Sequence, residues 1–132
     1  MQILILGATG RTGKLLTLLA LEKGYQVRVL VRNRSKLQLT DPNLEILEGS
    51  VTERSQLLNA MTGVKAILSC LNISRTSDFP WSALRSPKNF LSTVMSLMIE
   101  LTAATNVRRV IVTSAWGVGE TSNEIPGWFR WF

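Results

Sequence analysis

The chain has 132 residues, of which 45% are hydrophobic and 18% are charged, too apolar for a disordered polymer and too interrupted by charge for a membrane span. One cysteine and no histidine are present, which excludes an internal disulfide, a Cys/His zinc site and histidine-based catalysis. The net charge of +6 permits phosphate-bearing ligands, in nucleic acid, anionic lipid or a small cofactor.

The first third of the chain predicts a strand, a helix and a second strand. Residues 2–6 are apolar and end at Gly7, as in a strand buried on both faces. Residues 11–23 follow a helical apolar pattern, and residues 26–31 are rich in valine. These three segments form a βαβ unit. No basic leader or small-residue cleavage site precedes the first strand, so the expected compartment is cytoplasmic.

The same alternation continues to the end of the chain. It predicts a short helix or turn at 35–39, further strands at 44–47, 66–70 and 110–113, and helices at 53–61 and from Ser86-Pro87 toward Thr105. Thr52 is the expected cap of the helix 53–61. Five strands separated by helical segments predict one α/β domain over residues 1–132, with a doubly wound parallel sheet in the order 3-2-1-4-5 and helices on both faces.

A glycine-rich turn separates the first strand from its helix. Its sequence is Gly7-Ala8-Thr9-Gly10-Arg11-Thr12-Gly13, a GxxGxxG spacing rather than GxGxxG. Gly7 permits a tight turn, Gly10 lets the backbone approach phosphates, and Gly13 lets the helix lie close to the strand. Backbone amides and the positive helix end would hold a pyrophosphate there. The turn therefore predicts dinucleotide binding, with a merely structural turn as the alternative.

The end of the second strand indicates which dinucleotide. Arg28, Arg32, Arg34 and Lys36 form a basic cluster without an acid. An NAD-binding protein usually offers an acid to the ribose 2′-hydroxyl at this place, whereas an arginine accommodates the 2′-phosphate of NADP. Arg32 stands 19 positions after Gly13, so NADP (NADPH) is the predicted cofactor. The alternative is a solvated surface charge run.

Three stretches, Gly-Ala-Thr-Gly-Arg-Thr-Gly, Val-Leu-Val-Arg-Asn and Val-Thr-Ser-Ala-Trp-Gly, resemble the atypical short-chain dehydrogenase/reductases. Within them the chain is most similar to the NAD(P)H-binding group with NmrA-like proteins and the flavin/biliverdin reductase B type. The resemblance covers essentially the whole chain and implies a Rossmann-like fold. These families continue with a sixth strand and a substrate-pocket segment, so the resemblance also implies a C-terminally truncated member.

The resemblance assigns site residues by position. The cofactor phosphates would be bound by Gly7, Thr9, Gly10, Arg11, Thr12 and Gly13, and the 2′-phosphate by Arg32 with help from Lys36. Ser50 and Val51 would lie beside the adenine, Cys70, Leu71 and Asn72 alongside the nicotinamide ribose, and Ser114 opposite the reactive ring. Ser50 stands where members usually have Asp, and so loses a carboxylate acceptor.

The sequence offers one candidate residue for catalysis. The Tyr–Lys dyad of classical members is absent, because the only tyrosine, Tyr25, precedes the second strand. Ser114 is the best candidate to hydrogen-bond an acceptor. The implied function is an NADPH-dependent oxidoreductase that passes hydride to a small conjugated acceptor such as a flavin or quinone. The alternative is a non-catalytic NADP(H)-responsive redox sensor or regulatory protein.

The expected partners follow from the same features. No metal is expected, because one cysteine and no histidine are present, and no membrane, because charge interrupts the apolar runs. No nucleic acid is expected, because the aromatic residues are not interleaved with arginines as a base-stacking platform requires. A fifth strand at an exposed sheet edge, or the broad apolar surface of the long helix, would allow a homo-oligomer.

Overall fold

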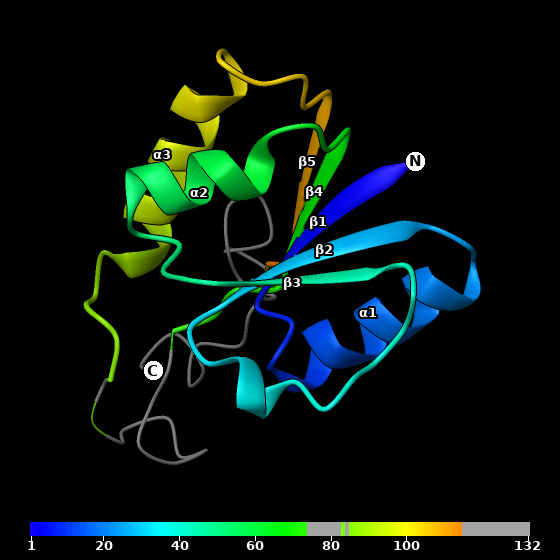
Figure 1. The fold of residues 1–132 in the computed structure, drawn as a ribbon. Coiled ribbons are helices and arrows are strands. Elements are labelled where there is room, and N and C mark those ends of the chain that lie inside the picture. The colour runs from blue at the N-terminus through cyan, green and yellow to red at the C-terminus, as the bar shows by residue number, and fades with distance from the viewer. Residues whose placement is uncertain (74–82, 84, 115–132) are drawn as a thin grey trace, which may run out of the picture.

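A computed structural model of the chain describes residues 1–73, 83 and 85–114, and within them a parallel sheet with helices on both faces (Figure 1). The strand order is β3-β2-β1-β4-β5, which confirms the predicted topology. The elements in chain order are β1 (Gln2–Leu6), α1 (Arg11–Glu22), β2 (Gln26–Val31), the 3-10 helix η1 (Arg34–Lys36), β3 (Leu44–Glu48), α2 (Arg54–Met61), β4 (Ala66–Ser69), α3 (Phe90–Thr102) and β5 (Arg109–Val112).

The central strand β1 shows why a continuous apolar run forms this sheet. Its side chains point alternately to the two faces. Leu4 and Leu6 pack into one core with α2 and α3, while Ile3 and Ile5 pack into a second core with α1. All four are buried, because β1 lies between β2 and β4 and is covered on both faces. The apolar run 2–6 therefore predicted correctly a strand that is buried on both faces.

Two helix starts differ from the sequence prediction. Thr52 does not cap α2, because Glu53 is the N-cap residue and the Thr52 hydroxyl instead lies 2.7 Å from Ser50 Oγ. The last helix begins at Phe90 and not directly after Pro87. The Phe90 amide donates to the Pro87 carbonyl at 3.0 Å, so Ser86-Pro87 opens a turn that leads into the helix.

The C-terminal end of α3 also comes earlier than predicted. The helix ends at Thr102, and residues 103–105 continue as a turn with hydrogen bonds such as Ala104 N to Leu101 O at 3.1 Å.

Among the described helices, none combines the length and the apolarity that a bilayer crossing requires.

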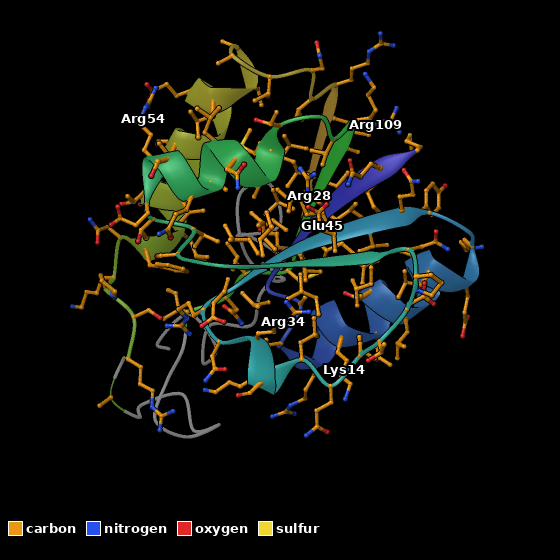
Figure 2. All side chains as sticks on the ribbon, in the orientation of Figure 1. Lys14, Arg28, Arg34, Glu45, Arg54 and Arg109 are labelled. Atoms are coloured by element: carbon orange, nitrogen blue, oxygen red, sulfur yellow. The ribbon has the colours of Figure 1, made fainter. Side chains whose placement is uncertain are left out.

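Arg28 has a structural role that its place in the basic cluster did not predict. Its Nη1 donates to the carbonyls of Ala60 at 3.0 Å and Thr62 at 2.6 Å, at the C-terminal end of α2. Its Nε donates to Glu45 Oε2 on β3 at 2.7 Å (Figure 2). The side chain is only 14% exposed. Arg28 thus ties β2 to α2 and β3, and its guanidinium is directed away from the end of β2 where Arg32 lies.

Replacing Arg28 tests this role. In Arg28→Met, two carbonyl acceptors at the end of α2 lose their donor, and we expect the free energy of unfolding to fall by about 1–3 kcal/mol. Arg54→Met is the control, because it removes the Arg54–Glu100 ion pair, whose side chains are more than half exposed, and should change stability by less than about 1 kcal/mol. Urea unfolding followed by circular dichroism measures both, and equal losses would contradict the assignment.

Candidate functional site

A cavity of about 450 Å³ lies beyond the carboxyl ends of the central strands. The glycine-rich turn, the end of β2, the segment after β3, the segment after β4 and the start of the α3 region contribute to its lining. This position follows from the topology. The chain leaves β1 toward β2 on one side and returns to β4 on the other, and the loops at such a switch point separate to leave a crevice.

The glycine turn is held together by close backbone contacts. Gly7 has a φ of +81°, and a Cβ there would lie 2.7 Å from the Cys70 carbonyl oxygen. A Cβ on Gly13 would overlap the Gly7 carbonyl oxygen and lie 2.7 Å from its carbonyl carbon. The first turn of α1 therefore rests directly on the turn that follows β1, as predicted for Gly13. The fold itself therefore requires glycine at positions 7 and 13.

Gly10 is different, because the protein around it tolerates a side chain better. A Cβ there would meet one neighbouring atom, the Gly7 carbonyl oxygen, at 3.3 Å. Gly10 is exposed and lines the cavity as the N-cap residue of α1. The absence of a side chain at Gly10 is therefore explained by a ligand that approaches the backbone from the cavity.

The start of α1 forms a positively polarised edge of the cavity. The first helical hydrogen bond joins the Lys14 amide to the Gly10 carbonyl at 2.9 Å, so the amides of residues 11–13 precede the intrahelical ladder. The N-cap offers no side-chain acceptor, and the first turn contains no acidic residue. The partial positive charge of the helix end is thus not neutralised by a neighbouring carboxylate in this turn, which favours an anion.

The end of β2 presents Arg32 to the same cavity. Arg32 is exposed and lines the cavity. The next residue, Asn33, is occupied locally, because its Oδ1 accepts from Ser35 N at 2.9 Å and Ser35 Oγ at 2.6 Å and caps η1. Lys36 is exposed at the end of η1 but does not belong to the described lining. The structure therefore brings Arg32, and not Lys36, to the glycine turn.

Ser50 and Val51 line the cavity after β3. Ser50 Oγ accepts from Thr52 N at 3.3 Å, and the Ser50 amide donates to Gln56 Oε1 at 2.6 Å. Ser50 thus retains a local acceptor role for a backbone amide, although it lacks the carboxylate expected at this place. Val51 is buried against the core beneath the cavity.

Cys70, Leu71 and Asn72 follow β4 and form the opposite wall. Burial raises the pKa of the Cys70 thiol, and a hydrogen bond with Thr113 opposes this shift. The raised pKa favours the protonated thiol, so Cys70 is a weak nucleophile that packs and lines the wall. Asn72 is exposed and its Oδ1 accepts from Ile73 N at 2.8 Å. Within the described part of the chain, no three acidic or cysteine side chains gather as a metal site requires.

Two findings at the remaining edge were not predicted. Ser114 lies two residues beyond β5 and is exposed, but it is not among the described lining residues. The segment that leads into α3 also contributes four lining residues that the sequence had not suggested: Arg85, Ser86, Pro87 and Phe90. No local sequence pattern indicated these residues, because they reach the cavity from a segment far along the chain from the glycine turn. Arg85 adds a second guanidinium to a cavity that already contains Arg32.

Comparisons with known proteins agree with this geometry. A family model described as NAD(P)H-binding matches residues 7–132. The photosystem II assembly factor Ycf39 of Trieres chinensis is 32% identical over 124 residues, which are 93% of this chain and 37% of that protein. Oxidoreductase GME11367 of Pestalotiopsis microspora is 25% identical, over 96% of this chain and 51% of that protein. The chain thus spans about a third to a half of the length of these two curated relatives.

A solved structure shows the same fold. ChuY, an anaerobillin reductase from Escherichia coli O157:H7, superposes with a TM-score of 0.76 at 16% identity, over 98% of this chain and 58% of that one.

The two glycines of the turn make a testable contrast. Gly13→Ala places a methyl group into the Gly7 backbone, and we expect it to lower the free energy of unfolding by about 3 kcal/mol or more, at the upper end of overpacking effects. Gly10→Ala meets only one atom at 3.3 Å and should change stability by less than about 1 kcal/mol. Urea unfolding by circular dichroism compares them. Equal destabilisation would show that Gly10 is also required by the fold alone.

Proposed function

This chain belongs to the NAD(P)H-binding family, and we propose that its cavity binds NADPH and that the protein is a reductase of a small conjugated acceptor such as a flavin or quinone. The observation that carries the proposal is the exposed, side-chain-free Gly10 at the positive end of α1, facing the cavity at the switch point of the sheet. This arrangement suits a pyrophosphate, which needs backbone amides at close range.

The lining fits the remaining parts of the nucleotide in sequence along the sheet. Gly7, Thr9 and Gly10 line the cavity and would hold the pyrophosphate, with Ser50 and Val51 beside the adenine. Arg11, Thr12 and Gly13 lie in the first turn of α1 outside the described lining, and we assign them to the same pyrophosphate through the amino end of the helix. Cys70, Leu71 and Asn72 would lie along the nicotinamide ribose. Their order around the cavity follows the strand order, because β2 and β3 lie on one side of β1 and β4 on the other. The adenosine half is therefore assigned to the β2–β3 side and the nicotinamide half to the β4 side.

Arg32 supports NADPH over NADH. It is exposed where the cavity meets the end of β2, and residues 31–34 contain no acid that would accept a ribose 2′-hydroxyl. A guanidinium forms paired, charge-assisted hydrogen bonds with a phosphate. Lys36, one turn of η1 further, would assist by charge from outside the lining.

Bound NADPH would supply a hydride, and the chain's own residues would position the acceptor and exclude competing reactions. Tyr25 lies at the amino ends of the strands, away from this cavity, so it does not replace the missing catalytic tyrosine. We propose that water supplies the proton and that Ser114 forms the hydrogen bond with the acceptor. The names of the relatives, an oxidoreductase and an anaerobillin reductase, support reductase chemistry.

One observation favours the alternative, a non-catalytic NADP(H)-responsive regulator. The described lining contains no carboxylate, lysine or tyrosine, and its thiol has a raised pKa. It therefore offers phosphate-binding groups without an evident general acid. Such a cavity would bind the nucleotide and report its redox state without turnover.

The cofactor assignment is tested with Arg32→Ala. Loss of the charged hydrogen bonds to the 2′-phosphate, about 1.5–3 kcal/mol, should weaken NADPH binding by roughly 10- to 100-fold and leave NADH binding within about twofold. Arg54→Ala, on α2 and outside the lining, is the control. Calorimetric titration measures the affinities. Equal NADPH and NADH affinities in both Arg32→Ala and the wild type would refute the preference for NADPH.

Turnover separates the two functions. NADPH oxidation is followed by its nicotinamide absorbance, with flavins and quinones as acceptors, in the wild type and Ser114→Ala. For a reductase we expect turnover in the wild type and roughly tenfold slower turnover in Ser114→Ala, the effect of one lost hydrogen bond. NADPH binding without oxidation by any of these acceptors would reject the reductase and favour the regulator.

A further inference from the structure

The cavity at the carboxyl ends of the strands contains a second guanidinium, which the assignment of NADPH leaves without a role. Among the described lining residues, the charged ones are Arg32 and Arg85. Arg32 directly follows β2, whereas Arg85 belongs to the segment that leads into α3, the helix that joins β4 to β5. Because β2 and β4 lie on opposite sides of β1, the two guanidiniums reach the cavity from opposite sides of β1.

The anionic groups of NADPH are matched by other parts of the cavity. The 2′-phosphate is assigned to Arg32, and the pyrophosphate to the backbone at the amino end of α1. The nicotinamide half, assigned to the β4 side, carries no further anionic group. An acceptor has to meet the nicotinamide ring on this side to receive a hydride. Arg85 therefore lies on the side of the cavity where the acceptor is expected.

The lining on the same side of β1 is largely apolar. Leu71 and Ile73 follow β4, Pro87 precedes α3, and Phe90 begins that helix. Leu71 and Phe90 also pack against the buried core between the sheet and the helices α2 and α3, so this wall is supported from behind. Arg85 is exposed. An apolar wall with one cation beside it suits a ligand that has a flat apolar ring and an anionic group on a side arm.

We propose that Arg85 binds an anionic group of the acceptor, a phosphate or a carboxylate, while the conjugated ring of the acceptor lies along the apolar wall. This inference rests on the proposed function and narrows it, because it restricts the preferred acceptors to conjugated compounds that carry an anion. A guanidinium forms paired, charge-assisted hydrogen bonds with either group.

The anionic group takes no part in the hydride transfer itself. Arg85 therefore stabilises the bound acceptor equally before and during the chemical step. Loss of such an interaction raises KM and leaves kcat unchanged. The competing assignment of Arg85 is the pyrophosphate of the cofactor, and it makes the opposite prediction, because NADPH and not the acceptor would lose affinity.

FMN and riboflavin are the probes, because they share one ring system and differ by a single phosphate. Flavin binding is measured by flavin fluorescence with saturating NADP⁺, and turnover by NADPH oxidation. For the wild-type protein we expect FMN to bind at least about tenfold more tightly than riboflavin, with a KM lower by the same factor and a preference that added salt reduces.

Substitutions of Arg85 place the phosphate. Arg85→Gln should bring the affinity for FMN to within about twofold of that for riboflavin, and leave kcat and the affinity for NADPH within about twofold of the wild type. Arg85→Lys keeps the charge without the paired donors, so it should retain part of the preference for FMN. Circular dichroism checks that each variant is folded, as expected for changes at an exposed position.

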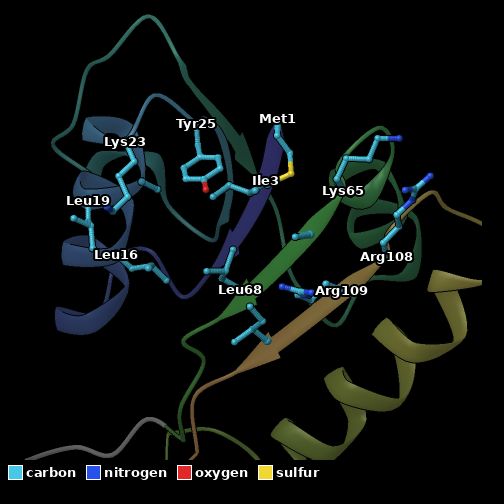
Figure 3. A pocket seen from close by; sticks show the side chains of 13 residues that line it. Met1, Ile3, Leu16, Leu19, Lys23, Tyr25, Lys65, Leu68, Arg108 and Arg109 are labelled. Carbon is cyan, nitrogen blue, oxygen red and sulfur yellow. The ribbon is translucent and has the colours of Figure 1, made fainter.

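Two exposed lysines provide charge-matched controls. Lys88 lies in the same segment as Arg85 but outside the described lining. Lys65 precedes β4 at the opposite end of the sheet, where it lines a separate hollow of about 610 Å³ that shares no described lining residue with the cavity (Figure 3). Lys88→Gln and Lys65→Gln should each leave the preference for FMN within about twofold. They separate a contact with Arg85 from the general attraction of a chain with net charge +6.

The remaining outcomes overturn the proposal. Equal binding of FMN and riboflavin by the wild type, or equal losses in Arg85→Gln and the two lysine variants, would each contradict it. Weaker NADPH binding by Arg85→Gln, with an unchanged preference for FMN, would assign Arg85 to the pyrophosphate. A wild-type protein that binds no NADPH would refute the proposed function, and flavin binding measured without nucleotide records the role of Arg85 separately.

Discussion

The contact between Gly13 and the backbone of Gly7 is the constraint on which the rest of this structure depends. Any side chain at residue 13 would overlap the Gly7 carbonyl, so the amino end of α1 sits directly on the turn after β1. That contact sets where the first helical amides lie and leaves Gly10 bare at the rim of the cavity. The switch point of the sheet provides the crevice, but the glycines determine that its edge is polarised backbone rather than side chain.

Much of this architecture could be predicted because burial on both faces leaves a simple signal. The run 2–6 is apolar without alternation, which predicted a strand buried on both faces, and right-handed crossovers favoured a doubly wound sheet. Helix ends were less predictable. Thr52 fits a cap by residue type, but its hydroxyl contacts Ser50 instead. Arg28 looked like part of a phosphate-binding cluster, whereas alternation along β2 directs it to the carbonyls at the end of α2.

The candidate site was predictable where it is backbone and strand end, and less so where a loop completes it. Gly7, Gly10, Arg32 and Cys70 line the cavity because each follows or ends a strand of known order. Arg85 and Phe90 reach the same cavity from far along the chain, and no local pattern encodes that approach. Lys36 was grouped with Arg32 by sequence distance, but the 3-10 turn capped by Asn33 carries it outside the lining.

Helix α1 connects two different requirements for glycine. Gly13 places the first turn of the helix against the Gly7 backbone, because the fold leaves no room there for a side chain, whereas Gly10, the N-cap residue, lines the cavity where the surrounding protein leaves more room. A change at Gly13 would therefore disturb the packing of the helix together with the amides that precede its hydrogen-bond ladder. A change at Gly10 would instead alter the surface that the cavity offers to a ligand and leave that packing in place.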